Sequence, residues 1–236
     1  MQKIALIIGI TGQDGAYLAR YLLNVGYKIY GTTRDSQICD TSRLRRLGVQ
    51  NDIKLLSLAL NDFRSVLKVI SNVNPNEIYN LAGQTSVGLS FDQPIEAMDS
   101  IANGTLNLLE AIIYLNKNIR FFNPGSSESF GNTGNIPANE ETKFRPRSPY
   151  AVAKSTAAWH VSTYRDSYNL FACTGFLSNH ESPLRHDRFV TKKIINGVKD
   201  IQKGKLEKLR IGNLDIYRDW GWAPKYVEAM YLMLQN

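Results

Sequence analysis

The 236-residue chain has little of what marks a metalloprotein, a disulfide-stabilised protein or a membrane protein. Its two cysteines, Cys39 and Cys173, and its three histidines show none of the C-x-x-C or H-x-x-x-H spacings typical of metal sites. Cysteines without such spacing favour a reducing compartment. The apolar run Ile4 to Ile8 is too short for the core of a signal peptide or for a membrane span. We therefore expect no metal, no membrane association and a cytoplasmic location.

The charge is the main departure from an ordinary composition, with a formal net charge of +7. Nucleic-acid binding is one explanation of such an excess. The basic residues are scattered, however, apart from Arg43, Arg45, Arg46 and the segment 199–210, and no stripe interleaves them with aromatic residues. We therefore favour a basic surface, or pockets for phosphorylated ligands, and expect no nucleic-acid partner.

Apolar runs alternate with helical patterns along most of the chain. The predicted strands are residues 3–8, 28–32, 52–56, 77–82, 119–122 and 170–176. The predicted helices are residues 14–25, 62–71 with Asp62 as its cap, 94–115, the segment after Pro149, 187–202 and 225–234. This alternation predicts an α/β fold with a doubly wound parallel sheet of the Rossmann type. We expect a Rossmann domain over residues 1–175 and a partial substrate-binding region, interleaved with the last sheet elements, over 176–236.

The first predicted strand runs into a glycine-rich turn that spans residues 9–15. Its pattern, G-x-x-G-x-x-G between a strand and a helix, lets backbone amides approach a pyrophosphate at the positive end of the helix. Glycines also serve plain turns, but the strand before and the helix after indicate a dinucleotide site. The predicted cofactor contacts in this turn are Gly9, Thr11, Gly12, Gln13, Asp14 and Gly15.

The residues after the second predicted strand distinguish NAD from NADP. An acid at this place binds the ribose 2′-hydroxyl, whereas a basic residue suits a 2′-phosphate. Arg34 favours NADP, with Ser36 as a helper, and Asp35 leaves NAD open. We predict that the chain binds NADP.

Ser148-Pro149-Tyr150 begins a predicted helix that also carries Lys154. Ser148 can cap the helix, and Pro149 suits its first turn. Tyr150 and Lys154 are four residues apart and share one face. A nearby ammonium favours the phenolate, so we expect the pKa of Tyr150 below its ordinary value of about 10. A lone Y-x-x-x-K is usually an ordinary helix surface, so the neighbouring motifs decide its meaning.

Hydroxyl and acidic side chains follow the fifth predicted strand, in Gly125-Ser126-Ser127-Glu128. Ligands of an open α/β sheet bind beyond the carboxyl ends of its strands, so we expect this cluster near the cofactor. Serine, tyrosine and lysine beside a nicotinamide suit hydride transfer at a carbinol: one hydroxyl orients the substrate and the phenolate takes the proton.

With these motifs the chain resembles the extended short-chain dehydrogenase/reductases and, within them, the GDP-mannose 4,6-dehydratase family. The resemblance rests on GITGQDGAYLA at 9–19, NLAGQTSVGLSF at 80–91, PRSPYAVAK at 146–154, NHESPLR at 179–185, FVTKK at 189–193, GNLD at 212–215 and RDWG at 218–221. It covers the whole chain. Members of the family continue beyond the position of Asn236, so the resemblance implies a C-terminally shortened form.

The resemblance also implies a role for each matched residue. It makes Ser126 the catalytic hydroxyl, Glu128 the active-site base, Tyr150 the phenolate and Lys154 its activating lysine. Further implied cofactor contacts are Leu60, Leu81, Ala82, Tyr150 and Lys154, and implied substrate contacts are Ser86, Ser127, Asn179, Val190, Lys193 and Arg218, with Arg218 facing the diphosphate. The chain departs from the family at Ala59 and Ile101, where members carry acidic or amide side chains.

The implied reaction converts GDP-mannose to GDP-4-keto-6-deoxymannose by an internal hydride cycle through bound NADP, in a homodimer or homotetramer. Two alternatives stay open. The first is a degenerate, truncated dehydratase that binds NADP without turnover. The second is an epimerase or reductase of the same superfamily, which the glutamate at position 128 disfavours.

Overall fold

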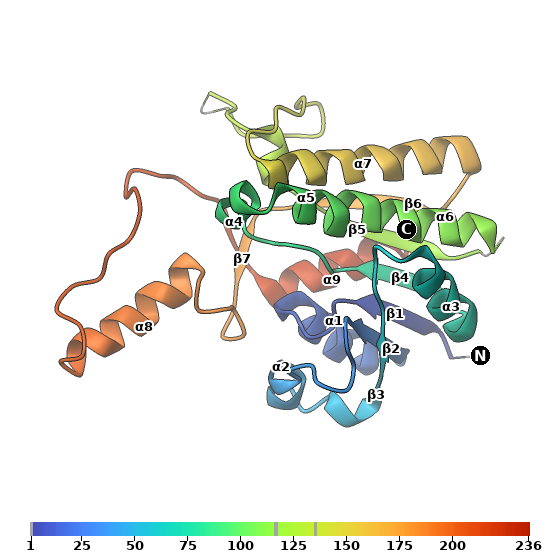
Figure 1. Cartoon of the computed structure of the whole chain (residues 1–236), viewed down its shortest axis with the longest axis horizontal. Helices are drawn as coiled ribbons and strands as arrows, with labels where there is room; N and C mark the ends of the chain where they lie inside the picture. The colour runs from blue at the N-terminus through green and yellow to red at the C-terminus, as the bar shows by residue number, and fades with distance from the viewer. Residues whose placement is uncertain (1, 116–117, 135) are drawn as a thin grey trace.

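The computed structural model describes residues 2–115, 118–134 and 136–236 and contains a six-stranded parallel sheet flanked by helices (Figure 1). The spatial order of the strands is β3-β2-β1-β4-β5-β6. Their bounds are β1 Ile4–Ile8, β2 Lys28–Thr33, β3 Ile53–Ser57, β4 Glu77–Asn80, β5 Arg120–Ser126 and β6 Ala172–Leu177. The predicted doubly wound sheet is confirmed. Its order changes direction between β1 and β4, which is where such sheets bind ligands.

The strands read as apolar runs because helices cover both faces of the sheet. Ala5 and Ile7 of β1 face one core cluster, and Leu6 and Ile8 face the other. The first cluster includes α1 (Gln13–Asn24), α2 (Ser42–Arg46) and α9 (Ala223–Met233). The second includes α3 (Phe63–Val73), α6 (Gly104–Tyr114) and α7 (Pro149–Tyr168). Because both faces of the sheet are buried, the carboxyl ends of its strands keep fixed positions along one edge of the sheet.

The helix caps follow from the sequence. The Asp62 side chain accepts a hydrogen bond from the Arg64 amide at 3.0 Å and caps α3. Ser148 accepts from the Ala151 amide at 3.1 Å and caps α7, with Pro149 in the first turn. Both predicted caps are confirmed. The cap of α7 fixes the start of the helix that carries Tyr150.

The predicted single helix over 94–115 is wrong in its middle. The structure has α5 (Pro94–Ala97), a π-helical segment (Met98–Asn103) and then α6. The widened turns pack on the loop after β4: a Cβ on Gly83 would lie 3.1 Å from Ile101, and Ser100 Oγ accepts from the Gln84 amide at 3.1 Å. π-Helical turns often mark functional sites, and this one adjoins the candidate cleft.

The strand predicted over 119–122 is also too short, because β5 continues through Pro124 to Ser126. Residues 123–126 pair with Thr174 to Leu177 of β6. On its other side β5 pairs with β4 only as far as Phe122, so Pro124 interrupts no ladder there. The extension carries Ser126 out to the carboxyl edge of the sheet.

Residues beyond the sheet form a smaller substructure. Strands β7 (Asn179–Glu181) and β8 (Trp220–Trp222) pair in parallel, and α8 (Val190–Gln202) projects away from the sheet (Figure 1). Two further short elements are α4 (Val87–Asp92) and the 3₁₀ turn Ser127–Phe130. No helix in the described part of the chain has the length and apolar character needed to cross a bilayer.

Candidate active site

The glycine-rich turn after β1 is closely packed and leaves a backbone cradle. Gly9 has a φ of +81°, and a Cβ there would lie 2.8 Å from the Leu81 carbonyl oxygen. A Cβ on Gly15 would lie 2.6 Å from the carbonyl oxygen of Gly9. Only glycine fits these two positions, and the turn leads directly into the positive end of α1 at Gly12. The turn therefore fits the pyrophosphate of a dinucleotide.

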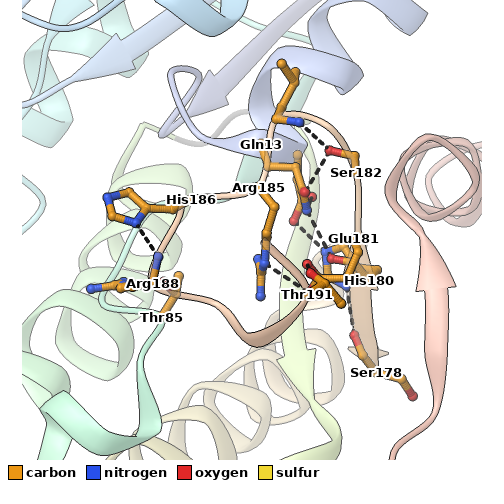
Figure 2. Close-up of polar contacts among 12 residues, drawn as sticks. Gln13, Thr85, Ser178, His180, Glu181, Ser182, Arg185, His186, Arg188 and Thr191 are labelled. Carbon is orange, nitrogen blue, oxygen red and sulfur yellow. Dashed lines mark hydrogen bonds and ion pairs between the residues drawn. The ribbon is translucent and has the colours of Figure 1, made fainter. Parts of the chain in front are cut away.

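The first two side chains of α1, Gln13 and Asp14, contact the segment that begins with β7, and Figure 2 shows the contacts of Gln13. The Gln13 amide nitrogen donates to the His180 carbonyl at 3.2 Å, and Ser182 Oγ donates to the Gln13 amide oxygen at 2.8 Å. Asp14 Oδ2 lies 2.8 Å from His180 Nε2. The sequence predicts Gln13 and Asp14 as cofactor contacts, and in the structure both side chains contact residues 180–182. The structure brings His180 and Ser182 to the same place, and sequence analysis missed both.

His180 lies between two hydrogen-bond acceptors. Its Nδ1 lies 2.8 Å from the Ser178 carbonyl oxygen and its Nε2 faces the Asp14 carboxylate, so the arrangement holds a proton on both ring nitrogens. Burial disfavours the charged ring, but the hydrogen bond and charge of Asp14 outweigh it and raise the pKa of His180 above 6.5. Burial works against the Asp14 carboxylate too, yet His180 lowers its pKa below 3.8. The ring stacks on Tyr226, with centroids 4.5 Å apart.

The segment after β2 presents Arg34 as an exposed basic side chain. Asp35 accepts from the Gln37 amide at 2.9 Å and is held in its own turn. Ser36 Oγ lies 3.0 Å from Ser57 Oγ of β3. Arg34 projects outward and forms an ion pair with Glu96 of α5 at 3.0 Å. Both Arg34 and Asp35 are exposed, but Asp35 is held in its own turn, whereas Arg34 reaches a partner on another element.

A cleft of about 390 Å³ opens at the carboxyl edge of β4, β5 and β6. Most of the predicted site residues line it: Asp14, Leu81, Ala82, Ser86, Ser126, Ser127, Glu128, Tyr150, Lys154, Asn179 and Val190. The residues come from five separate parts of the chain and share one cavity. Such convergence is what an active site requires.

The pKa predicted for Tyr150 is wrong in this structure. Burial raises it above 10; the hydrogen bond with Ser126 lowers it, and the charge of Glu128 raises it further. Lys154 Nζ donates to the Pro124 carbonyl at 2.8 Å and lies 5.8 Å from the Tyr150 ring centre. Burial lowers the pKa of Lys154 to about 8. The ammonium is directed at a carbonyl instead of the phenol, and the expected activation of the phenol is absent.

Other predicted residues lie outside this cleft. Arg218 is exposed between α8 and β8 and donates to the Tyr217 carbonyl at 2.9 Å. Lys193 lies on α8, and the Leu60 carbonyl accepts from Asn107 of α6 at 2.7 Å. Arg34 is likewise absent from the lining.

Two arginines that sequence analysis missed line the cleft (Figure 2). Arg185 forms an ion pair with Glu181 at 3.1 Å, and Arg188 donates to Thr85 Oγ at 3.1 Å. Two features of the sequence could have indicated these arginines. The net positive charge suggested a pocket for a phosphorylated ligand, and basic residues follow the segment that forms β7.

Comparison with known proteins agrees with the parallel sheet and indicates the family. Residues 6–236 match the family model described as GDP-mannose 4,6 dehydratase. The chain is 46% identical to GDP-mannose 4,6 dehydratase of Cricetulus griseus, covering 100% of this chain and 65% of the relative. It is 45% identical to GDP-mannose 4,6 dehydratase 1 of Arabidopsis thaliana, covering 100% of this chain and 68% of the relative. The chain thus spans only about two thirds of the length of these relatives.

Solved structures share the fold at lower identity. A dTDP-glucose 4,6-dehydratase from Bacillus anthracis in complex with NAD has a TM-score of 0.83 at 21% identity, covering 99% of this chain and 72% of that one. A UDP-glucose 4-epimerase from Thermus thermophilus with NAD has a TM-score of 0.85 at 21% identity, covering 99% and 75%.

The parallel sheet, the glycine-rich turn and the helix that carries Tyr150 and Lys154 define a short-chain dehydrogenase/reductase. Within that class, the match over residues 6–236 is decisive. The chain belongs to the GDP-mannose 4,6-dehydratase family.

Proposed function

We propose that the chain carries the catalytic residues of an NADP-dependent sugar-nucleotide dehydratase that converts GDP-mannose to GDP-4-keto-6-deoxymannose. The observation that supports this is the convergence of Ser126, Glu128, Tyr150 and Lys154 on one cleft beside the glycine-rich turn. A carboxylate beside the tyrosine favours elimination over simple epimerisation or reduction, because a second base is available for a carbon acid.

Each residue has one task in the proposed reaction. Ser126 orients the sugar, and Tyr150 takes the proton of the C4 hydroxyl. Glu128 removes the proton at C5, which the C4 ketone has made acidic, and water leaves from C6. NADP, when bound, would accept the hydride from C4 and return it to C6, while a proton returns to C5. Because burial raises the pKa of Tyr150 in the free protein, the ligands must displace Lys154 from Pro124 toward the phenol for proton transfer.

NADP is the proposed cofactor because the exposed Arg34 side chain extends to Glu96 of α5, whereas the Asp35 carboxylate, which is also exposed, is held in its own turn. The backbone of residues 9–15 would hold the pyrophosphate, and Arg34 with Ser36 would face the 2′-phosphate. Calorimetric titration with NADP and NAD at one salt concentration tests this. Stronger binding of NADP is expected, and equal or stronger binding of NAD would transfer the role to Asp35.

A sugar nucleotide is the proposed substrate. Arg185 and Arg188 line the cleft and supply positive charge for a diphosphate, in addition to the assignments of Asn179, Val190, Lys193 and Arg218. The relatives are named for GDP-mannose, and solved neighbours are described with UDP-glucose or with NAD.

A second candidate is a protein that binds NADP without turnover. Arg218 and Lys193 lie outside the cleft, and Ile195 and Val198 on α8 are half exposed, which leaves the substrate side less enclosed than the cofactor side. Incubating the chain with NADP and GDP-mannose, followed by detection of the 4-keto product, separates the two. Product formation supports the dehydratase, whereas NADP binding without product supports the second candidate.

We also propose a homodimer or homotetramer that pairs through α5–α6 and α7, with a cytoplasmic location. Large apolar side chains on these helices and on adjoining α4 are exposed: Phe91, Ile95, Tyr114, Val152 and Trp159. Monomers rarely leave so much apolar surface on neighbouring helices. Both cysteines are free, which agrees with a reducing compartment.

A further inference from the structure

An ion pair crosses the carboxyl end of β1. Arg34 directly follows β2, and Glu96 belongs to the connection after β4; their side chains meet at 3.0 Å. Strands β2 and β4 are the two neighbours of β1 in the sheet. The pair therefore spans the gap above the strand whose end carries the glycine-rich turn, which is the place proposed for the cofactor.

The two side chains of the ion pair differ in solvent exposure. The Arg34 side chain is 86% exposed, whereas Glu96 is 37% exposed. The second carboxylate oxygen of Glu96, Oε2, is buried and has no hydrogen-bond partner among the described residues. A partly buried carboxylate with an unpaired oxygen is a fixed negative charge, and the flexible arginine has turned to meet it. Arg34 is thus already engaged before any ligand arrives.

We propose that Glu96 is a specificity-determining residue, which competes with the 2′-phosphate of NADP for Arg34 and so narrows the preference for NADP over NAD. The inference rests on the proposed assignment of Arg34 to the cofactor. NAD has no 2′-phosphate, so its binding does not require Arg34 to leave Glu96. Glu96 therefore weakens the binding of NADP and leaves the binding of NAD unchanged.

The size of the effect follows from the charges. A guanidinium binds carboxylate and phosphate with the same planar fork, and the phosphate carries the larger charge, so NADP displaces Glu96. An exposed ion pair is weak, so the expected change in affinity is modest: Glu96→Gln tightens NADP binding about three- to ten-fold and leaves NAD within about two-fold.

A double-mutant cycle on the whole chain tests the inference. NADP and NAD affinities are measured by calorimetry at low and high salt for the unmodified chain, Glu96→Gln, Arg34→Gln and the double variant. The expected result is tighter NADP binding in Glu96→Gln, a smaller gain at high salt, and no gain when Arg34 is also replaced. Asp92→Asn, an exposed acid at the end of α4, removes the same charge nearby and should change neither affinity.

The outcomes distinguish a failure of the cofactor role of Arg34 from a failure of the competing role of Glu96. If Arg34→Gln leaves the ratio of NADP to NAD affinity unchanged, the assignment of Arg34 fails and the inference fails with it. If Arg34→Gln weakens NADP alone but Glu96→Gln alters neither cofactor, or alters both equally, only the role of Glu96 is overturned. A gain in Glu96→Gln that persists without Arg34 also overturns it, because the competition would then not run through the arginine.

Discussion

Asp14 and His180 join the turn that would hold a cofactor to the strand that leads into the substrate side of the cleft. Their side chains lie 2.8 Å apart although 166 residues separate them in the chain. The bond fixes the start of α1 against β7 without any strand pairing between them. Together with the contacts of Gln13 with His180 and Ser182, it positions residues 178–182 relative to the glycine-rich turn.

This pair predicts a stability that depends on pH. The pKa of His180 is raised in the folded chain. The contribution of His180 to the free energy of unfolding is therefore complete below pH 6.5 and is lost as pH rises through the pKa of the folded state. Because the pKa of Asp14 is lowered, its contribution is complete above pH 3.8 and is lost as pH falls through the folded value. Asp14→Asn should cost about 1–3 kcal/mol near pH 5.5 and less at pH 9. Thermal unfolding at both pH values measures this.

His186→Asn is the matched control for that experiment. His186 is exposed, and among the described residues its ring accepts a hydrogen bond from the nearby Arg188 amide. Its replacement should change the unfolding temperature equally at both pH values. An Asp14→Asn penalty that is the same at pH 5.5 and pH 9 would show that the pair is not an ion pair.

Tyr150 and Glu128 should fail at different stages of the proposed reaction. Tyr150→Phe removes the base of the first step, so neither reduced nicotinamide nor a 4-keto species should appear. Glu128→Gln permits that step and blocks proton removal at C5. Each loss should lower the rate by about 10² to 10⁴. Absorbance of reduced nicotinamide and solvent deuterium at C5 of the product distinguish the stages, and normal turnover by Glu128→Gln would favour an epimerase or reductase.

Lys154 should set an upper limit on the pH range of activity. Burial lowers its pKa to about 8, so the free protein loses the ammonium as pH rises through that value. The value of kcat/KM, which reports groups of the free enzyme, should fall above about pH 8. Lys154→Arg should be slower but should keep its rate to higher pH, because a guanidinium stays protonated. A fall at the same pH in both proteins would assign it to another group.

Glu77 of β4 should be important for stability although it is remote from the cleft. Its carboxylate is buried and accepts from Tyr27 at 2.8 Å, Tyr79 at 2.9 Å and the Gln235 amide at 3.2 Å. Glu77→Gln should cost about 1–3 kcal/mol, which lowers Tm by about 2–10 °C in a chain of this size. Glu110→Gln is the control, because that glutamate also accepts from a tyrosine but is exposed, so a much smaller change is expected.

The proposed oligomer predicts more than one chain per particle at micromolar concentration. Light scattering should give the mass of a dimer or tetramer. Ile95→Glu or Trp159→Glu, at positions 75% and 63% exposed, should shift the population toward monomer. Ile216→Glu, at a 47% exposed position outside these helices, should not. A monomeric unmodified chain would contradict the proposal.

Local features of the sequence predicted most of the sheet and the core of the site. Strands buried on both faces are continuous apolar runs, such as residues 4–8, and the caps Asp62 and Ser148 act on their own helices. The four-residue spacing fixes Tyr150 and Lys154 on one helix whatever surrounds it.

Features that depend on distant neighbours could not be predicted. The raised pKa of Tyr150 comes from burial by segments far along the chain, and the π-helical segment depends on how Gly83 packs on Ser100. Strands β7 and β8 are three residues each, too short for a periodic pattern to show. Asp14 pairs with His180 of β7 and Arg34 with Glu96 of α5, and no spacing in the sequence indicates either pairing.

The pairing of β7 with β8 has one more consequence. Asn179 lies opposite Trp220 and Glu181 opposite Trp222, so the segment 182–219 leaves from one end of this short parallel ladder and returns to the other. A segment closed in this way can change its length or content without moving the strands that close it, since loop closure costs little extra as a loop grows. The segment 182–219 can therefore be exchanged as a unit. Selectivity at the mouth of the cleft can therefore diverge, or be transplanted between relatives, while the nucleotide-binding core stays the same.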